Sequence, residues 1–336
     1  MNMKKSLILL AVFLFTTIGT FSSCDGSVRA SLLPNVSGKE GDVLVVINKS
    51  EWDGNLGQTI RDTLTQEYPY IPMVEPMFNL SYVPHSAFND MFQMHRNIVI
   101  VNIDPKATEG GILYKKDVWA APQSVIKLNA SSSSEAADIF KENSRGIITF
   151  LEQTERERMM SNTRKYEEHS LVPKISKMAG GSPHFPYGYF MKKKTNDFIW
   201  VSHETQYTQQ NVLIYKYPVV EGMDMMAPEN LRAAADKMLM ENIPGMFENT
   251  YMIISPVVDP YIGYRKYKDN HFAEMKGFWE VYGDYMGGPF VSHVYYAPDG
   301  KNMVMLVGFV YAPKYDKRTY MRQLEAILFS FEWNKD

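Results

Sequence analysis

Cysteine is almost absent from the sequence. One residue, Cys24, is the only thiol in 336 residues. A chain with a single cysteine cannot form an internal disulfide, and the part that follows Cys24 has no thiolate for a metal site or for nucleophilic catalysis. The fold must therefore rest on its hydrophobic core. The 45% hydrophobic share is ordinary for a globular chain, and its length suffices for one large domain or two smaller ones.

An excess of charge of one sign is also missing. The formal net charge is −3, and the sequence has no long basic run. Proteins that bind nucleic acid usually carry a basic patch that meets the phosphates. The composition therefore predicts no nucleic-acid partner.

Long apolar runs are limited to the N-terminus. The run at 7–18 is interrupted only by Thr16 and Thr17, and Lys4 and Lys5 precede it. It is shorter than the roughly 20 residues that a spanning helix needs. Basic residues, an apolar run and then small residues predict a secretory signal peptide over residues 1–23. An uncleaved anchor helix is the alternative.

Cys24 stands where a lipoprotein signal peptidase would require it, directly after Phe21, Ser22 and Ser23. A thiol can accept a diacylglyceryl group, so we expect Cys24 to be the lipid attachment residue of a membrane-anchored lipoprotein carrying palmitate-type chains. Each buried methylene contributes about 0.8 kcal/mol to such an anchor. The expected location is the cell envelope, at the outer membrane. A chance cysteine after an ordinary signal is the other interpretation.

The rest of the chain predicts an α+β fold with mixed or antiparallel sheets and flanking helices. Residues 24–40 are predicted to be a flexible tether, 41–135 an N-terminal α/β part, and 136–336 a C-terminal α+β part that can pack with the first as one domain. Strands are expected at 43–47, 78–83, 98–103, 124–129, 185–191, 198–203, 212–217, 290–296 and 303–311. Helices are expected at 51–66, 86–94, 135–169, 229–242, 272–282 and 318–331. The order of elements in the second half leaves open whether an α+β unit is duplicated there.

Catalytic signatures are lacking. The sequence has no glycine-rich phosphate loop after a strand, no G-x-S-x-G elbow and no His-Glu-x-x-His helix. We therefore expect no cofactor. His203 and His293 could face one another across strands, but no acidic pair stands at ligand spacing, so no metal site is predicted.

Aromatic residues offer the main functional signal. Tyr261, Tyr264 and Tyr267 recur every third residue, and three more rings follow at Trp279, Tyr282 and Tyr285. Such rings can stack on the faces of sugars. Packing between a sheet and a helix is the commoner role, and burial decides between the two. The nearby Arg265, Lys266 and Lys268 fit either an anionic partner or the charged guard of a strand edge.

Several segments resemble a known family. They are Glu51-Trp52-Asp53-Gly54, the segment 95–101, Met286-Gly287-Gly288-Pro289-Phe290, the segment 308–313 and Tyr320-Met321-Arg322. These resemble a family of Bacteroidota lipoproteins, domain-of-unknown-function family 4837. The resemblance extends over nearly the whole chain after Cys24 and implies an envelope location, but it implies no activity, cofactor or catalytic residue.

Two functional hypotheses remain. The first is a non-catalytic binding or scaffolding module that recognises an envelope protein or a glycan. The second is an envelope hydrolase that acts on glycan or peptide through paired carboxylates. Glu280 and Asp284 are the candidate pair, because at i and i+4 of a predicted helix they would share a face.

Overall fold

The computed structural model describes residues 32–335, so the predicted signal peptide, Cys24 and the first part of the predicted tether lie outside the described residues. The chain forms two compact units. Unit 1 comprises the chain up to Leu56 together with Ser81–Phe140, and unit 2 comprises Gly57–Leu80 together with Lys141–Asp336. The predicted α+β class is confirmed, because sheets and helices occupy comparable parts of the structure. Within the described range, no helix is both long enough and apolar enough to span a bilayer.

Unit 1 is built on a five-stranded sheet with the order β2-β1-β3-β5-β4. Its strands are β1 (Asp42–Val46), β2 (Asn79–Val83), β3 (Asn97–Ile103), β4 (Gly111–Lys116) and β5 (Ser124–Ala130). β1 and β3 are parallel, as are β3 and β5, whereas β4 runs antiparallel to β5. The sheet is therefore mixed, which is one of the two predicted kinds.

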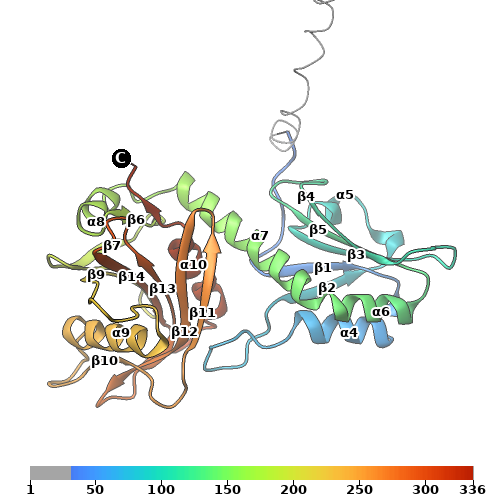
Figure 1. The fold of residues 1–336 in the computed structure, drawn as a ribbon. Coiled ribbons are helices and arrows are strands. Elements are labelled where there is room, and N and C mark those ends of the chain that lie inside the picture. Colours follow the sequence, from blue (N-terminus) through green and yellow to red (C-terminus); the bar gives the residue numbers. More distant parts are fainter. Residues whose placement is uncertain (1–31, 336) are drawn as a thin grey trace, which may run out of the picture. The chain divides into compact units, whose positions relative to one another are not determined.

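The central strands of this sheet are apolar on both faces, which explains their continuous runs of branched residues. Leu44, Ile98 and Val125 belong to one core cluster, against which Phe88 and Trp119 pack. α6 (Ser133–Glu142) runs along one side of the sheet (Figure 1) and buries Ala136, Ala137 and Phe140.

Two predicted helices near this sheet are shorter than expected. The helix predicted at 51–66 is two helices, α3 (Lys49–Trp52) and α4 (Asn55–Leu64), separated at Asp53 and Gly54. The helix predicted at 86–94 is a 3₁₀ turn (His85–Ala87) followed by α5 (Asp90–Gln93). Asn89 accounts for the break, because its side chain accepts a hydrogen bond from Met91 N and starts a new turn.

Unit 2 is built on an antiparallel sheet with the order β10-β12-β13-β14-β9-β8-β7, and β11 also pairs with β12. Its strands are β7 (Phe190–Lys194), β8 (Phe198–Glu204), β9 (Gln209–Pro218), β10 (Tyr251–Ile254), β11 (Tyr261–Tyr267), β12 (Asn270–Tyr282), β13 (Gly287–Tyr296) and β14 (Asn302–Tyr311). A small separate sheet pairs β6 (Gly181–Ser182) with β15 (Glu332–Trp333).

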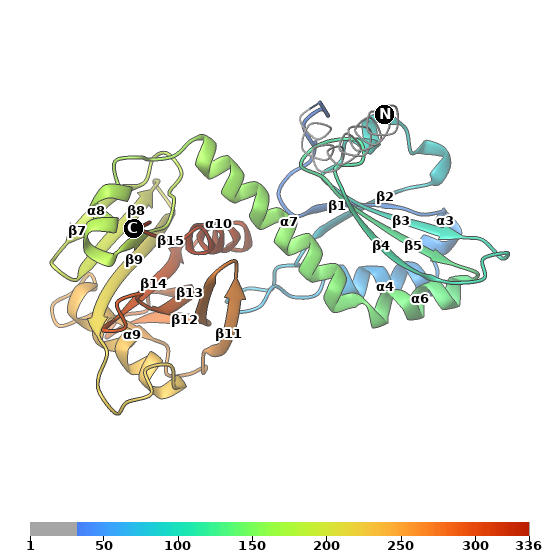
Figure 2. The same cartoon turned by 45° about the horizontal axis from the view of Figure 1, so that its top comes forward.

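Helices cover both faces of the large sheet, as can be followed in Figures 1 and 2. Side chains alternate between faces along a strand. On β14, Met305 and Val307 lie in the core cluster that includes Leu231 of α9 (Pro228–Asn242). Gly308 faces the other way, where an added Cβ would lie 3.1 Å from Leu324 Cβ of α10 (Arg318–Phe329). The missing side chain therefore allows α10 to approach the sheet closely.

The helix predicted at 272–282 is wrong, because this segment is the long central strand β12. Ala, Glu, Met and Lys in its first half are good helix formers. From Met275 onward, however, buried and partly exposed residues alternate, and aromatic residues favour a strand. Pairing with strands on both sides then overrides the local preference.

The second half of the chain nevertheless shows a repeated order of elements. Three antiparallel strands (β7, β8, β9) lead into α9, and three more (β12, β13, β14) lead into α10. β9 and β14 pair with each other at the centre of the sheet. The last strand of each set therefore meets its counterpart, and each set extends outward from that pair.

Candidate functional site

A charged cavity of about 490 Å³ lies within unit 2, on the face of the sheet that α10 covers. Its walls come from α7 (Ser144–Lys165), α10, β11, β12 and the loop after α4. The lining side chains that carry a full charge are Glu152, Arg156, Arg265, Lys266, Lys268, Glu274, Lys276 and Glu325. The volume falls in the range of roughly 300 to 1,000 Å³ that small-molecule sites occupy.

Strand alternation brings Glu274 and Lys276 to the same face of β12, since they are two residues apart. β11 pairs with β12 so that Tyr261 lies opposite Lys276 and Gly263 opposite Glu274. Arg265 therefore reaches the same face, and its Nε and Nη2 lie 3.1 Å and 3.0 Å from Glu274 Oε2.

The helices contribute charged residues at helical spacing. Arg318, Arg322, Glu325 and Phe329 stand at i, i+4, i+7 and i+11 of α10, which places them along one side of that helix. Arg322 forms an ion pair with Glu152 of α7, and its Nη2 donates 2.6 Å to Met77 O.

Lys276 joins two carboxylates. Its Nζ lies 2.7 Å from Glu325 Oε1 and 3.6 Å from Glu274 Oε1. Tyr68 OH donates 3.4 Å to the same Glu325 oxygen. Glu274 and Glu325 thus share one ammonium group, which distinguishes them from the free carboxyl pair of a glycosidase.

The surroundings fix the charges of this cluster. Burial favours the neutral form of Glu325, but Lys276 and the nearby Arg156 and Arg322 outweigh it and lower the pKa of the carboxyl below its ordinary value. Burial also opposes the charge on Lys276, yet Glu325 and Glu274 raise its pKa. At neutral pH neither group exchanges a proton readily.

His293 lies behind the cluster with its Nε2 4.0 Å from Glu274 Oε1. Burial, and then the charge of Lys276, lower its pKa well below the usual range. The imidazole is therefore neutral at neutral pH. Its Nδ1 lies 3.1 Å from Tyr295 OH.

The loop after α4 closes one end of the cavity and is fixed to α10. Glu75 is 5% exposed, and its carboxylate accepts hydrogen bonds from Lys317 N at 2.7 Å and Arg318 N at 2.9 Å. These amides belong to the first turn of α10, where a negative charge is favourable. The loop itself is held by Tyr68 N, which donates to Glu75 O.

The six candidate stacking rings do not form one surface. Tyr267 lines the charged cavity but packs edge-on against Phe329, at 5.1 Å between ring centroids. Tyr264 projects to the opposite face of β11, as its odd spacing from Tyr267 requires, and its hydroxyl donates to Met226 O. Tyr261 lies 6.5 Å from the Tyr70 ring.

The other three rings lie near the far end of β12. Trp279 is 3% exposed and packs against Phe309 in the core, on the face of the sheet opposite the cavity. Tyr282 is exposed and stacks on Tyr251 at 5.1 Å between centroids, and Tyr285 is fully exposed in the turn that follows. Only Tyr282 and Tyr285 of this group have ring surface open to solvent.

Two predicted pairs are not brought together as expected. Glu280 lies on β12 and Asp284 in the turn after it, so the predicted helical face does not exist. Asp284 Oδ1 instead accepts a hydrogen bond from Tyr285 N. His203 on β8 and His293 on β13 are separated by β9 and β14. Within residues 32–335, no three His, Cys, Asp or Glu side chains are grouped to hold a metal ion.

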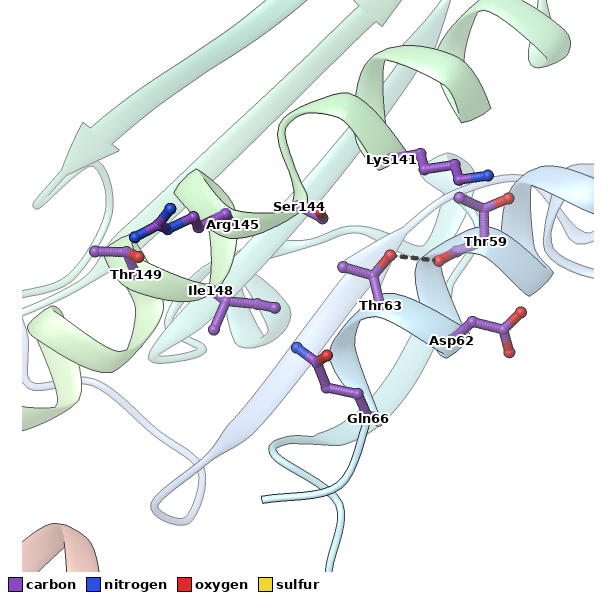
Figure 3. A pocket seen from close by; sticks show the side chains of 9 residues that line it. All are labelled: Thr59, Asp62, Thr63, Gln66, Lys141, Ser144, Arg145, Ile148 and Thr149. Atoms are coloured by element: carbon purple, nitrogen blue, oxygen red, sulfur yellow. Dashed lines mark hydrogen bonds between the residues drawn. The ribbon is translucent and has the colours of Figure 1, made fainter. Parts of the chain in front are cut away.

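Other depressions are more open or less charged. Figure 3 shows one of about 590 Å³, lined by side chains of α4 such as Thr63 and of α7 such as Arg145. Thr63 is already bonded to its own helix through Thr59 O. A further depression in unit 1 lies at the carboxyl ends of β1 and β3, with Glu51 and His85 in its wall.

Sequence reasoning identified Arg265, Lys266 and Lys268 of the cavity as fitting an anionic partner but missed its other charges. Glu274, Lys276 and Glu325 were hidden inside segments predicted as helices, and Arg156 lay in the helix predicted at 135–169, to which no function was assigned. The available signal was polar residues at positions that a strand pattern would bury, as in Ala273-Glu274-Met275-Lys276-Gly277.

Comparison with known families covers most of the described chain. Residues 168–330 match the model of the family described as Domain of unknown function (DUF4837). This segment belongs to that family. Residues 36–164 match a second, described as Domain of unknown function (DUF8532). No curated protein matches the chain.

Both matched segments contribute to the charged cavity. Arg265, Glu274, Lys276 and Glu325 lie in the DUF4837 segment, whereas Glu152 and Arg156 of α7 lie in the DUF8532 segment. All of these residues belong to unit 2. The compact unit that holds the cavity is therefore larger than the DUF4837 segment alone.

Proposed function

We propose that the protein is a lipid-anchored envelope lipoprotein that binds a glycan in the charged cavity of unit 2 without transforming it. The anchor rests on the signal-like N-terminus and Cys24. The binding role rests on one observation: a cavity of about 490 Å³ carries many hydrogen-bonding groups whose charges are fixed by ion pairs. A small cavity of this kind suits a sugar unit better than the flat surface of a protein partner.

The fixed charges favour binding over acid–base catalysis. A hydrolase of the paired-carboxylate kind needs one carboxyl group with a raised pKa that can donate a proton. The pKa of Glu325 is lowered instead, because the ammonium of Lys276 lies 2.7 Å away. The alternative pair, Glu280 and Asp284, lies on a strand and a turn.

A steric block of the cavity tests the proposal. Gln153 is an exposed cavity residue of α7, so Gln153→Trp should fill the entrance without disturbing the buried ion pairs. Ser161→Trp is a matched control, because Ser161 is exposed on the same helix but lines none of the depressions described above. The full chain in detergent micelles is applied to an array of envelope glycans.

We expect saturable binding to be retained in wild type and in Ser161→Trp and to be lost in Gln153→Trp. Mass spectrometry of the bound glycan after prolonged incubation should show an unchanged mass. Equal binding by both variants, or no glycan bound by wild type, would contradict the proposed role. Shortened glycan products that disappear in Glu325→Gln would favour the hydrolase.

A further inference from the structure

The ion pairs of the cavity leave two cationic side chains over, the exposed Lys266 and the partly buried Arg156. Glu152 pairs with Arg322, Glu274 with Arg265, and Glu325 with Lys276. In the part of the chain that the structure describes, Arg156 has no carboxylate within ion-pair distance. The cavity wall therefore holds a guanidinium group that makes no direct ion pair, although Glu325 is near enough to interact with its charge.

Arg156 is held in a defined orientation. Its guanidinium carbon lies 3.9 Å from the centroid of the Phe329 ring and 5.9 Å from that of Tyr267. A cation over a ring face is attracted by the electrons of the ring. The ring covers the face of the guanidinium group, while the donors of that group point along its edges.

One of these donors is buried without a partner. Arg156 Nε is inaccessible to solvent and has no hydrogen-bond acceptor in residues 32–335. A buried donor left unsatisfied costs roughly 1 to 3 kcal/mol, more when it is charged. Because Nε is closed to solvent, a ligand in the cavity would meet the two Nη groups instead, and the planar fork of arginine can offer a carboxylate two parallel hydrogen bonds.

We infer that Arg156 binds the carboxylate of an acidic sugar in this cavity. The inference rests on the proposed function and names the class of glycan. Glu152, Glu274 and Glu325 offer acceptor oxygens to hydroxyl groups of the same sugar. A ligand with one negative charge and several hydroxyls can pair with the Arg156 guanidinium and donate hydrogen bonds to the cavity carboxylates at the same time.

The same carboxylates disfavour other anions. A phosphate carries close to two negative charges at neutral pH, and the guanidinium group of Arg156 neutralises only one of them, so the second lies near the wall carboxylates. A neutral sugar leaves the Arg156 donor without a charged acceptor. The cavity therefore discriminates by charge in both directions.

Nuclear magnetic resonance titration of the full chain in detergent micelles tests the inference. The probes are methyl glucuronide, methyl glucoside and inorganic phosphate, each added to wild type, Arg156→Gln, Arg156→Lys and Arg145→Gln. Arg145 is an exposed residue of the same helix whose side chain lines the separate depression of Figure 3, so it controls for loss of a positive charge.

We expect methyl glucuronide to bind wild type and Arg145→Gln about tenfold or more tightly than methyl glucoside, in line with the strength of a charge-assisted pair. Arg156→Gln should lose this preference, and Arg156→Lys should recover only part of it. Equal affinity for the two glycosides, tighter binding of phosphate, or an unchanged preference in Arg156→Gln would overturn the inference. Neutral glycan binding that Gln153→Trp blocks would leave the proposed function standing while refuting this choice of ligand.

Discussion

At the scale of single residues, Lys276 has the clearest expected effect on stability. Lys276→Met would leave Glu274 and Glu325 buried without the ammonium that contacts both. Breaking a buried pair by removing one partner usually costs about 3 to 5 kcal/mol. Urea unfolding should therefore show a loss of that size in the free energy of unfolding.

A matched exposed pair provides the control for this substitution. Lys192 Nζ lies 2.6 Å from Glu204 Oε1 at the surface of the same sheet. Lys192→Met should change the free energy of unfolding by no more than about 1 kcal/mol. Equal losses in the free energy of unfolding would mean that the buried ion cluster stabilises the fold no more than an exposed ion pair does.

Glu325 should make stability depend on acid pH. Its pKa in the folded protein is lowered from the ordinary value of 4.5, chiefly by Lys276 acting against the effect of burial. A group of this kind stabilises the fold fully above its unfolded pKa, and the contribution disappears as the pH falls through the lower folded value. The urea midpoint of wild type should therefore fall below pH 4.5 more steeply than that of Glu325→Gln. Parallel curves for the two proteins would contradict this.

Lys276 should make stability depend on alkaline pH, in the opposite direction to Glu325. Its folded pKa is raised from the ordinary value of 10.5, so its contribution is complete below that value and is lost as the pH rises through the higher folded pKa. Together the two groups define a broad stable range that spans neutral pH. This is the behaviour expected of a structural ion cluster.

At the scale of elements, Glu75 determines how α10 begins. Glu75→Ala would leave Lys317 N and Arg318 N without their acceptor. The loss of a buried charged acceptor should lower the free energy of unfolding by about 1 to 3 kcal/mol. Glu67→Ala, an exposed substitution near the same loop, should stay within about 0.5 kcal/mol. Thermal unfolding of both variants measures the difference, and a neutral Glu75→Ala would show that the helix end finds another partner.

The elements also show what the sequence could predict. Val43 to Ile47 and Ile98 to Ile103 were predicted as strands because their apolar runs leave little choice. β10, β11 and the edge strand β4 were not predicted. Their residues are partly exposed and weakly patterned, and they become strands by pairing with neighbours such as β12.

The candidate site was less predictable than the fold. Tyr267 was identified as an aromatic near a site, but the charges around it depend on β12 being a strand and on α7 and α10 meeting across it. A periodicity argument applied to one segment cannot reveal such a meeting. Arg156 could have been noticed only once Phe329 was known to lie against it.

At the scale of the whole molecule, we propose that Cys24 determines where the protein resides. We expect wild type to incorporate labelled palmitate and to fractionate with membranes, and Cys24→Ala to lose the label and appear in the soluble fraction, because the acyl chains supply the membrane affinity. Ser23→Ala is the neighbouring control and should keep the label. Label that persists in Cys24→Ala would refute the lipoprotein assignment.

The ion pair between Glu152 and Arg322 joins positions 170 residues apart in the chain. The pocket that contains them is therefore incomplete until α10, which follows the other cavity walls in the chain, has been synthesised and has docked. A nascent chain that stops short of that helix would leave Glu152 without Arg322 and Lys276 without Glu325. Ligand recognition thus depends on the wall that is synthesised after all the others.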